Sequence, residues 1–210
     1  MSPTDYMRSR FFRDQCWFDV ANASGEVIPP FSVVYNYSPA VGNNNFGFFV
    51  AKPNAAATDF YRDYFVTGPY SIAAASGAEG IACSLSSVGF VRTNGSPTAG
   101  AVWGPKHGQF TLQENYYGFL MHSATTTVAG VTVALAKQVG ITGVFGKVDD
   151  ATVNKNAAAT ISIWDSARAG DTGMNVSAIN RSINLTGVNG KMCHVFAPGT
   201  FAEFSMVECS

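Results

Sequence analysis

Short runs of apolar and β-branched residues alternate with Gly, Pro, Asn and Asp along the chain. Such runs are typical of strands, and the breaks between them are typical of tight turns. Because the breaks recur about every 8 to 12 residues without a long helical period, the pattern predicts an all-β fold of the sandwich or barrel type. Residues 59–66, where aromatic and charged residues alternate, fit either a helical turn or a half-exposed strand. The other predicted strands cover residues 15–21, 31–37, 46–51, 131–135, 141–148, 159–164, 175–179, 191–196 and 201–207, with two more between residues 80 and 91.

The segment of residues 100–120 is rich in aromatic residues separated by Gly and Pro. This pattern predicts short strands folded back on one another by tight turns. A catalytic loop would bring carboxylates or histidines together, whereas this segment carries only Lys106, His107 and Glu114 as charged or imidazole side chains. We therefore interpret the segment as scaffold.

The end of the strand pattern near residues 137–140 predicts a boundary between two units. The chain is long enough for one large β domain or two small ones, since either would bury a core of its own. We favour two tandem small β-sandwich or barrel units, residues 15–138 and 139–210, preceded by an arm of residues 1–14. No repeat with a period of about 20 to 50 residues is visible, which disfavours a solenoid or propeller.

Charged residues make up only 13% of the chain, about half of the roughly 25% of a typical domain. Much of the surface must therefore consist of Ser, Thr, Asn, Gly and Ala, which protect poorly against association. We expect other subunits to cover a good share of this surface, in a homo-oligomer for which a trimer is one option. A monomeric β protein rich in Thr and Asn is the alternative.

The charge balance and the N-terminal sequence limit the partners of the chain. A net charge of -1 and a pI near 6.3 disfavour a protein that grips nucleic acid by its phosphates. The N-terminus lacks the apolar stretch of a signal peptide, and no run reaches the roughly 20 apolar residues that span a bilayer. We expect a protein made in the cytoplasm with no nucleic-acid or membrane partner.

The first 14 residues combine basic and aromatic side chains, namely Arg8, Arg10, Phe11, Phe12 and Arg13. Such a mixture can bind single-stranded nucleic acid by charge and stacking, but two aspartates in the same segment weaken that option. We predict instead that the arm binds a neighbouring subunit, its phenylalanines filling pockets and its arginines pairing with carboxylates. Packing of the arm on its own domain is the other alternative.

Motifs of catalysis and nucleotide binding are missing from the sequence, among them G-x-S-x-G, H-E-x-x-H, G-x-x-x-x-G-K-[ST] and G-x-G-x-x-G. We interpret His107, which follows a Gly-Pro-Lys turn, as a loop residue. Asp149 and Asp150 form the only adjacent acidic pair, and neighbours in a strand or turn point apart, so we assign them to a turn. We expect neither an enzyme nor a bound cofactor.

The cysteines are widely scattered and form no C-x-x-C pair; they are Cys16, Cys83, Cys193 and Cys209. Structural zinc sites use closely spaced ligand pairs, and small secreted frameworks use dense sets of cysteines. We therefore predict free, mostly buried thiols that pack as small apolar groups. Cys193 stands beside His194, but we expect no metal at this pair.

Several turn and strand signatures occur in a fixed order, at residues 22–34 (N-A-S-G-E-V-I-P-P-F-S-V-V), 51–53 (A-K-P), 67–69 (T-G-P), 102–112 (V-W-G-P-K-H-G-Q-F-T-L) and 117–119 (Y-G-F). This order resembles a group of tailed-phage virion proteins, in which N-D-S-G-E-x-I-P-P leads to an apolar run, K-P, N-G-P and W-G-P-x-x-G. Thr67 stands where that pattern has Asn. Residues 159–164 (A-T-I-S-I-W) and 171–176 (D-T-G-M-N-V) resemble the small β domain that often follows in these proteins.

The resemblance implies a structural component of the virion, and a charge-poor chain of two β units suits a decoration or cement protein on the capsid surface. Its partners would be the major capsid protein and neighbouring copies of itself. The alternative is a head or tail fibre, or a tail accessory protein, that binds a host surface glycan. Candidate glycan contacts are then Trp103, Trp164, Tyr116 and Tyr117, although residues beside strands more often pack in a core.

Overall fold

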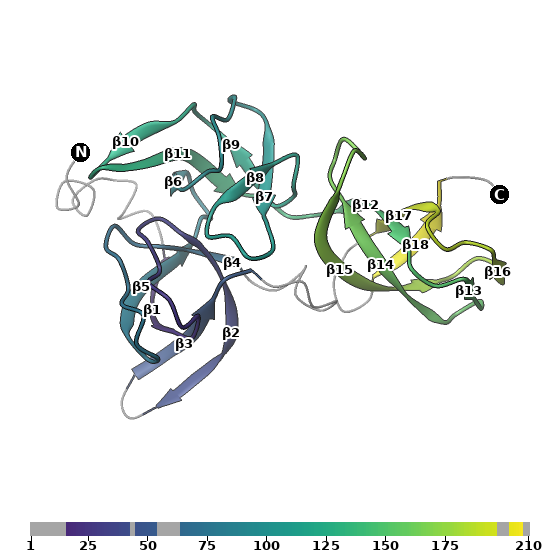
Figure 1. Cartoon of the computed structure of the whole chain (residues 1–210), viewed down its shortest axis with the longest axis horizontal. Coiled ribbons are helices and arrows are strands. Elements are labelled where there is room, and N and C mark those ends of the chain that lie inside the picture. Colours follow the sequence, from purple (N-terminus) through teal and green to yellow (C-terminus); the bar gives the residue numbers. More distant parts are fainter. Residues whose placement is uncertain (1–15, 43–44, 54–63, 197–201, 208–210) are drawn as a thin grey trace. The chain divides into compact units, whose positions relative to one another are not determined.

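The computed structural model describes residues 16–42, 45–53, 64–196 and 202–207 (Figure 1). Over these residues the chain forms strands β1 to β18 and no helix, so the predicted all-β class is confirmed. Accordingly, this described part holds no helix that is long and apolar enough to cross a membrane. The chain divides into two compact units, the first made of Met1–Pro53, Asp63–Glu114 and Gly118–Val139, and the second of Asn54–Arg62, Asn115–Tyr117 and Gly140–Ser210.

The first five strands of the first unit close into a barrel with the neighbour order β1-β3-β2-β4-β5. They are β1 (Cys16–Asn22), β2 (Val33–Gly42), β3 (Asn45–Ala51), β4 (Tyr64–Thr67) and β5 (Glu79–Ser84). β1 and β3 are parallel, whereas the other neighbouring pairs are antiparallel. The core of this barrel consists of Val20, Ile28, Val34, Val50, Phe65, Ile72 and Ala82.

Two local details of this barrel differ from the sequence analysis. Of the two options left open for residues 59–66, a helical turn or a half-exposed strand, the described part is a strand, but β4 is buried at all four positions and is therefore covered on both faces. Residues 59–63 lie outside the described residues. The strand predicted from residue 31 begins only at Val33, because Phe31 has a φ of 56° and no solvent exposure. The backbone N–H of Phe31 donates to Gly68 O at 3.0 Å, and its carbonyl accepts from Arg92 N–H at 2.9 Å.

The remaining strands of the first unit form a sheet with the order β10-β11-β9-β7-β8, in which β6 also pairs with β11. They are β6 (Gly89–Val91), β7 (Val102–Pro105), β8 (Leu112–Glu114), β9 (Phe119–Met121), β10 (Thr126–Val128) and β11 (Val131–Gln138). β7, β8 and β9 are the short, folded-back strands predicted for residues 100–120, and Trp103 is 2% exposed between them. The sheet packs on the barrel of the same unit through Phe31, Phe90 and Trp17.

The second unit holds another closed barrel, with the neighbour order β12-β14-β15-β18-β17. Its strands are β12 (Gly143–Val148), β14 (Ala158–Trp164), β15 (Asp171–Asn180), β17 (Met192–Phe196) and β18 (Glu203–Met206), and the short strands β13 (Thr152–Val153) and β16 (Leu185–Thr186) pair beside it. β15 and β18 are parallel. β15 begins four residues earlier than predicted (Asp171 against 175), and the buried Thr172 hydroxyl in this extension donates to Ile163 O at 2.8 Å.

The two barrels have the same order and relative direction of paired strands. The neighbours β4-β5-β1-β3-β2 of the first barrel correspond to β12-β14-β15-β18-β17 of the second, and the parallel pair falls at the same place in both. Numbered along the chain, the second barrel has the order 1-2-3-5-4, which is the connectivity of the OB-fold, a five-stranded Greek-key barrel. In the first barrel the first strand along the chain, β1, corresponds to the third strand of the second barrel, β15. The first barrel is therefore a circular permutation of the second.

A buried asparagine ends β1, the strand of the first barrel that corresponds to β15 of the second. Asn22 ends β1 with 0% exposure, and its Oδ1 accepts the backbone N–H and the hydroxyl of Ser24, both at 2.7 Å. Its Nδ2 donates to Glu26 O and to Ala73 O, both at 2.7 Å. The backbone N–H of Asn22 donates to Ala78 O at 2.9 Å. The side chain thus forms the predicted turn after β1 and ties it to the connection of residues 68–78.

An equivalent asparagine ends β15, the corresponding strand of the second barrel. Asn180 ends β15 with 0% exposure, and its Oδ1 accepts the backbone N–H and the hydroxyl of Ser182 at 3.1 and 2.9 Å. Its Nδ2 donates to Ile183 O at 2.6 Å and to Val153 O at 3.2 Å. Its backbone N–H donates to Ala157 O at 3.0 Å. The same N-x-S turn is therefore built at equivalent points of both barrels.

Candidate functional site

The residues predicted to bind a partner subunit, Arg8, Arg10, Phe11, Phe12 and Arg13, lie outside the described residues. Their role stays a prediction.

The four aromatic residues considered for glycan binding separate into two groups. Trp103 and Tyr116 are 2% and 8% exposed, so they are core residues and present no ring to a ligand. Tyr117 and Trp164 are half-buried. Of the four, these two are the side chains that reach the surface.

Trp164 belongs to a row of aromatic rings on the outside of the second barrel. It is paired with Phe145 across β14 and β12, and Phe145 is paired with His194 across β12 and β17. The ring centroids of Phe145 and His194 are 5.2 Å apart, and those of His194 and Phe196 are 4.5 Å apart in an edge-to-face contact. We call these residues, Trp164, Phe145, His194 and Phe196, the aromatic row.

Two cations lie over the rings of the aromatic row. The Nζ of Lys147 is 4.0 Å from the centroid of Trp164, and the guanidinium carbon of Arg168 is 5.0 Å from that of Phe145. Both distances are in the range of cation–π attraction. The row therefore joins apolar area with positive charge, and Phe196 remains 46% exposed beside it.

The backbone around the row is shaped to hold it. A Cβ on Gly143 would lie 2.6 Å from His194 Cε1, so the imidazole rests directly on the glycine backbone. The N–H of Phe145 donates to Tyr117 Oη at 3.3 Å within the second unit. Burial raises the pKa of Tyr117, the bond from Phe145 opposes this rise, and the Asp165 carboxylate adds to it. Tyr117 is thus a neutral phenol that positions the row.

Most of the aromatic row was not predicted from the sequence, although a signal for it exists. In β12 the burial alternates with period two, so Phe145 and Lys147 are on the outside while Val144 and Val148 are inside. The same holds for Trp164 in β14 and for His194 in β17. The strands were recognised, but which face of each points outward depends on the closure of the barrel.

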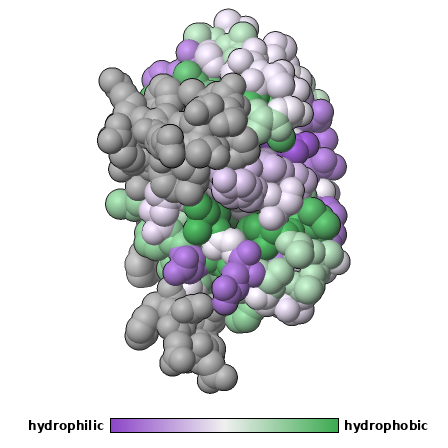
Figure 2. Space-filling model, turned by 90° about the vertical axis from the view of Figure 1, so that its left-hand side faces the viewer, coloured by the Kyte–Doolittle hydropathy of each residue, from purple (hydrophilic) through white to green (hydrophobic). Residues whose placement is uncertain are grey.

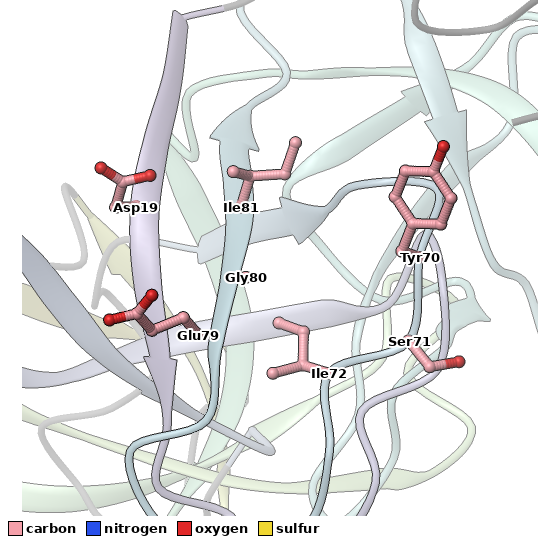
Figure 3. A pocket seen from close by; sticks show the side chains of 7 residues that line it. All are labelled: Asp19, Tyr70, Ser71, Ile72, Glu79, Gly80 and Ile81. Carbon is pink, nitrogen blue, oxygen red and sulfur yellow. The ribbon is translucent and has the colours of Figure 1, made fainter. Parts of the chain in front are cut away.

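A second surface feature is a groove of about 370 Å³ on the first barrel (Figure 3). It is lined by Asp19, Tyr70, Ser71, Ile72, Glu79, Gly80 and Ile81. In the register of β1 and β5, Asp19 is paired with Ile81 and Glu79 with Ala21, so both carboxylates are on the outer face. Figure 3 shows the two carboxylates pointing to one side of β5, with Tyr70 and Ser71 on its other side.

The floor of the groove depends on Gly80, which has no side chain. A Cβ on Gly80 would lie 2.5 Å from Ile72 Cγ1, and Ile72 is itself 2% exposed because its side chain belongs to the core of the barrel. Ile72 therefore packs on the glycine, while Tyr70, two residues earlier, is 55% exposed at the rim. The groove combines a rigid floor with an open aromatic wall.

Asp149 and Asp150 form hydrogen bonds within the fold, and the Cys193 thiol is buried. Ser162 Oγ donates to Asp149 Oδ1 at 2.8 Å and Thr160 N–H donates to Asp150 Oδ2 at 2.9 Å, so the two carboxylates hold the turn after β12. Burial, with a smaller effect of Asp149, raises the pKa of the Cys193 thiol to about 12, which leaves it protonated.

Cys193 and His194 point to opposite faces of β17, since Cys193 is buried and His194 is half-buried on the outside. Cys83 is also buried and Cys16 is exposed, so two of the three described cysteines match the prediction of free, mostly buried thiols; Cys209 lies outside the described residues. Among the described residues no group of three or more His, Cys, Asp or Glu side chains is placed to hold a metal ion.

Comparisons with protein-family models, with curated proteins and with solved structures gave no significant match for this chain.

Proposed function

We propose that the chain is a structural protein of a tailed-phage virion, a capsid decoration protein that binds the major capsid protein and neighbouring copies of itself. The support from the sequence is the resemblance to virion proteins and the content of 13% charged residues. On the face drawn in Figure 2, strongly hydrophilic residues form small groups among apolar and weakly polar ones. A surface of this composition is suited to being covered by protein.

The observation that carries the proposal is the aromatic row. Trp, Tyr and Arg are the residue types most enriched at the centre of protein interfaces, and aromatic anchors are the usual source of their affinity. Lys147 and Arg168 add positive charge over the rings. We therefore expect the row to bind an acidic, partly apolar surface of the capsid protein, with the cations paired to its carboxylates.

The test uses heads that lack the protein and recombinant full-length chain. Occupancy after sedimentation is measured for the wild type, for Phe196→Ala and for Arg168→Glu. Both substitutions should weaken attachment by at least about tenfold, because they remove an aromatic anchor or reverse a charge at the contact. The matched control is Ile183→Ala, which shortens a 67% exposed apolar side chain elsewhere in the second unit.

Attachment of the control and of both variants at wild-type occupancy would show that the row is not the contact. A wild-type chain that never binds heads would contradict the decoration role itself. Copy number in purified particles gives an independent reading, since hundreds of copies indicate decoration and a few dozen or fewer indicate a tail, collar or fibre.

The predicted arm is tested separately by removing residues 1–14. If Arg8, Arg10, Phe11, Phe12 and Arg13 bind a neighbouring subunit, the truncated chain should lose attachment to heads. Its thermal unfolding is measured alongside, because an arm that packs on its own domain would lower stability instead. Unchanged occupancy of the truncated chain would contradict the arm's role.

The alternative function, a fibre or tail accessory protein that binds a host glycan, has its own supporting observation. The groove of the first barrel presents Tyr70, 55% exposed, beside two carboxylates. This site is distinct from the aromatic row.

A further inference from the structure

We propose that Arg168 makes the aromatic row selective for a carboxylate of its partner, and that Asp165 holds this arginine in position before the partner binds. The inference rests on the proposed function and deepens it, because it assigns the selectivity of the row to one residue and the placement of that residue to another. Three observations carry it, namely the backbone conformation of Arg168, the hydrogen bonds of its loop and the surroundings of its guanidinium.

Arg168 has a backbone conformation that residues with a Cβ rarely adopt. It lies in the loop of residues 165–170, which joins β14 to β15, and its φ is 58°. Contact between Cβ and the backbone makes this left-handed region unfavourable for residues other than glycine. Residues held in it persist where the surrounding structure fixes them, and they cluster at binding sites. The presence of an arginine here therefore points to a role for its side chain.

The loop is fixed by hydrogen bonds that centre on Asp165. Its carbonyl accepts from Arg168 N–H, and its Oδ1 accepts from Ala169 N–H, both at 2.9 Å. From outside the loop, the carbonyl of Asn115 accepts the N–H of Ser166 at 2.7 Å within the second unit. Bonds to two successive amides hold the backbone at Arg168, so the arginine loses less freedom when a partner binds.

The guanidinium of Arg168 lies over a ring and keeps its donors for another molecule. Its carbon is 5.0 Å from the centroid of Phe145, and the residue is exposed. In the part of the chain that the structure describes, no carboxylate forms an ion pair with it. A guanidinium carries five N–H donors in a rigid fork that matches the two oxygens of a carboxylate. A carboxylate of the partner is thus the group that completes this site.

The other cation of the row is less suited to this selection. The Nζ of Lys147 is 4.0 Å from the centroid of Trp164, its side chain is half-buried, and an ammonium is a compact charge without a fork. Acidic residues flank this ring, since Asp165 follows Trp164 in the chain and Asp171 is paired with it across β14 and β15. They repel a chain of phosphates more strongly than a single carboxylate that approaches Arg168.

The experiment measures attachment of the full-length chain to heads that lack it, as occupancy against chain concentration. Arg168→Lys keeps the charge but loses the fork, so the concentration for half occupancy should rise about tenfold or more. Asp165→Ala should raise it about three- to tenfold, whereas Asp165→Asn keeps an acceptor for Ala169 N–H and should stay within about twofold. The matched controls, Arg181→Lys and Asp150→Ala, change an arginine and a backbone-bonded carboxylate elsewhere in the second unit and should also stay within about twofold.

Two further variants separate the conformation of Arg168 from its contacts. Arg168→Gly and Arg168→Ala should both lose attachment at least about tenfold, because each removes the guanidinium. In thermal unfolding, however, the glycine variant should have the higher Tm, since glycine adopts a positive φ without the Cβ penalty. Oligo-dT is titrated into the wild type and Arg168→Ala as a phosphate probe, and no binding that depends on the arginine is expected.

The inference is overturned if Arg168→Lys attaches like the wild type, if Asp165→Asn is as weak as Asp165→Ala, or if Arg168→Gly unfolds below Arg168→Ala. Binding of oligo-dT that is lost in Arg168→Ala would also overturn it, because the row would then recognise phosphates. If the wild type does not bind heads, the proposed function fails together with this inference. Weakening by Phe196→Ala without any effect of Arg168→Lys rejects this inference alone.

Discussion

The buried asparagine at the end of β1 provides the sharpest test of how the first barrel is held together. Asn22→Ala removes two bonds donated by Nδ2, to Glu26 O and Ala73 O, and two accepted by Oδ1 from Ser24. A typical hydrogen bond contributes about 1 kcal/mol net, and a partner left unpaired in a buried site costs more. Since part of this turn is exposed and water can replace some partners, we expect the free energy of unfolding to fall by about 2–4 kcal/mol.

The assay is urea unfolding of the first unit, followed by the fluorescence of Trp17 and Trp103 in a Trp164→Phe background. The comparison variant is Asn94→Ala, which loses one exposed bond to Gln113 Oε1 at 2.9 Å and should cost about 0.5 kcal/mol. Hydrogen exchange supplies a second reading, because the amides bonded between the turn and residues 77–78 should lose protection. A cost for Asn22→Ala no larger than that for Asn94→Ala would refute the role assigned to the turn.

Four further outcomes follow from the structure. Asn180→Ala should destabilise the second unit by a similar ~2–4 kcal/mol, read from Trp164 fluorescence, and a much smaller cost would break the equivalence of the two turns. Gly146→Ala should destabilise the same unit, because the new Cβ would lie 2.7 Å from a backbone oxygen of β14; thermal unfolding unchanged from the wild type would contradict this contact. In a Cys209→Ser background, the exposed Cys16 should react with a thiol reagent in the native protein, whereas the buried Cys193 and Cys83 should react only after unfolding. Burial raises the pKa of Asp149, partly offset by the Ser162 hydroxyl, so stability should fall as pH rises above the ordinary range of a carboxyl and through that raised pKa; Asp149→Asn should lack this fall in urea titrations over the same pH range.

Much of the fold could be predicted from the local pattern. The alternation of β-branched and aromatic runs with Gly, Pro and Asn located most strands, since side-chain period and turn chemistry are local properties. The segment of residues 100–120 was recognised as short folded-back strands for the same reason. Errors arose where long-range packing decides the outcome, as at Phe31, which is in a left-handed conformation between two segments that bond its backbone.

The candidate sites were largely beyond the sequence. Asp19 and Tyr70 are 51 residues apart by their numbers, and Phe145 and His194 are 49 apart, so neither pair forms a recognisable motif. The permuted relationship of the barrels was equally hidden, because a repeat search compares residues in the same order, and here the equivalent strands occur in a different order. Only the pairing of strands showed that Asn22 and Asn180 occupy the same place.

The amino-acid sequence by itself determined the strand content, the turns and the charge-poor surface, because each depends on residue type and near neighbours. The tertiary structure decided which face of each strand is outside, which distant side chains share a groove or a row, and which strands close each barrel. The physical reason is that barrel closure pairs strands far apart in the chain, and this pairing assigns every alternate residue to the core or to the surface.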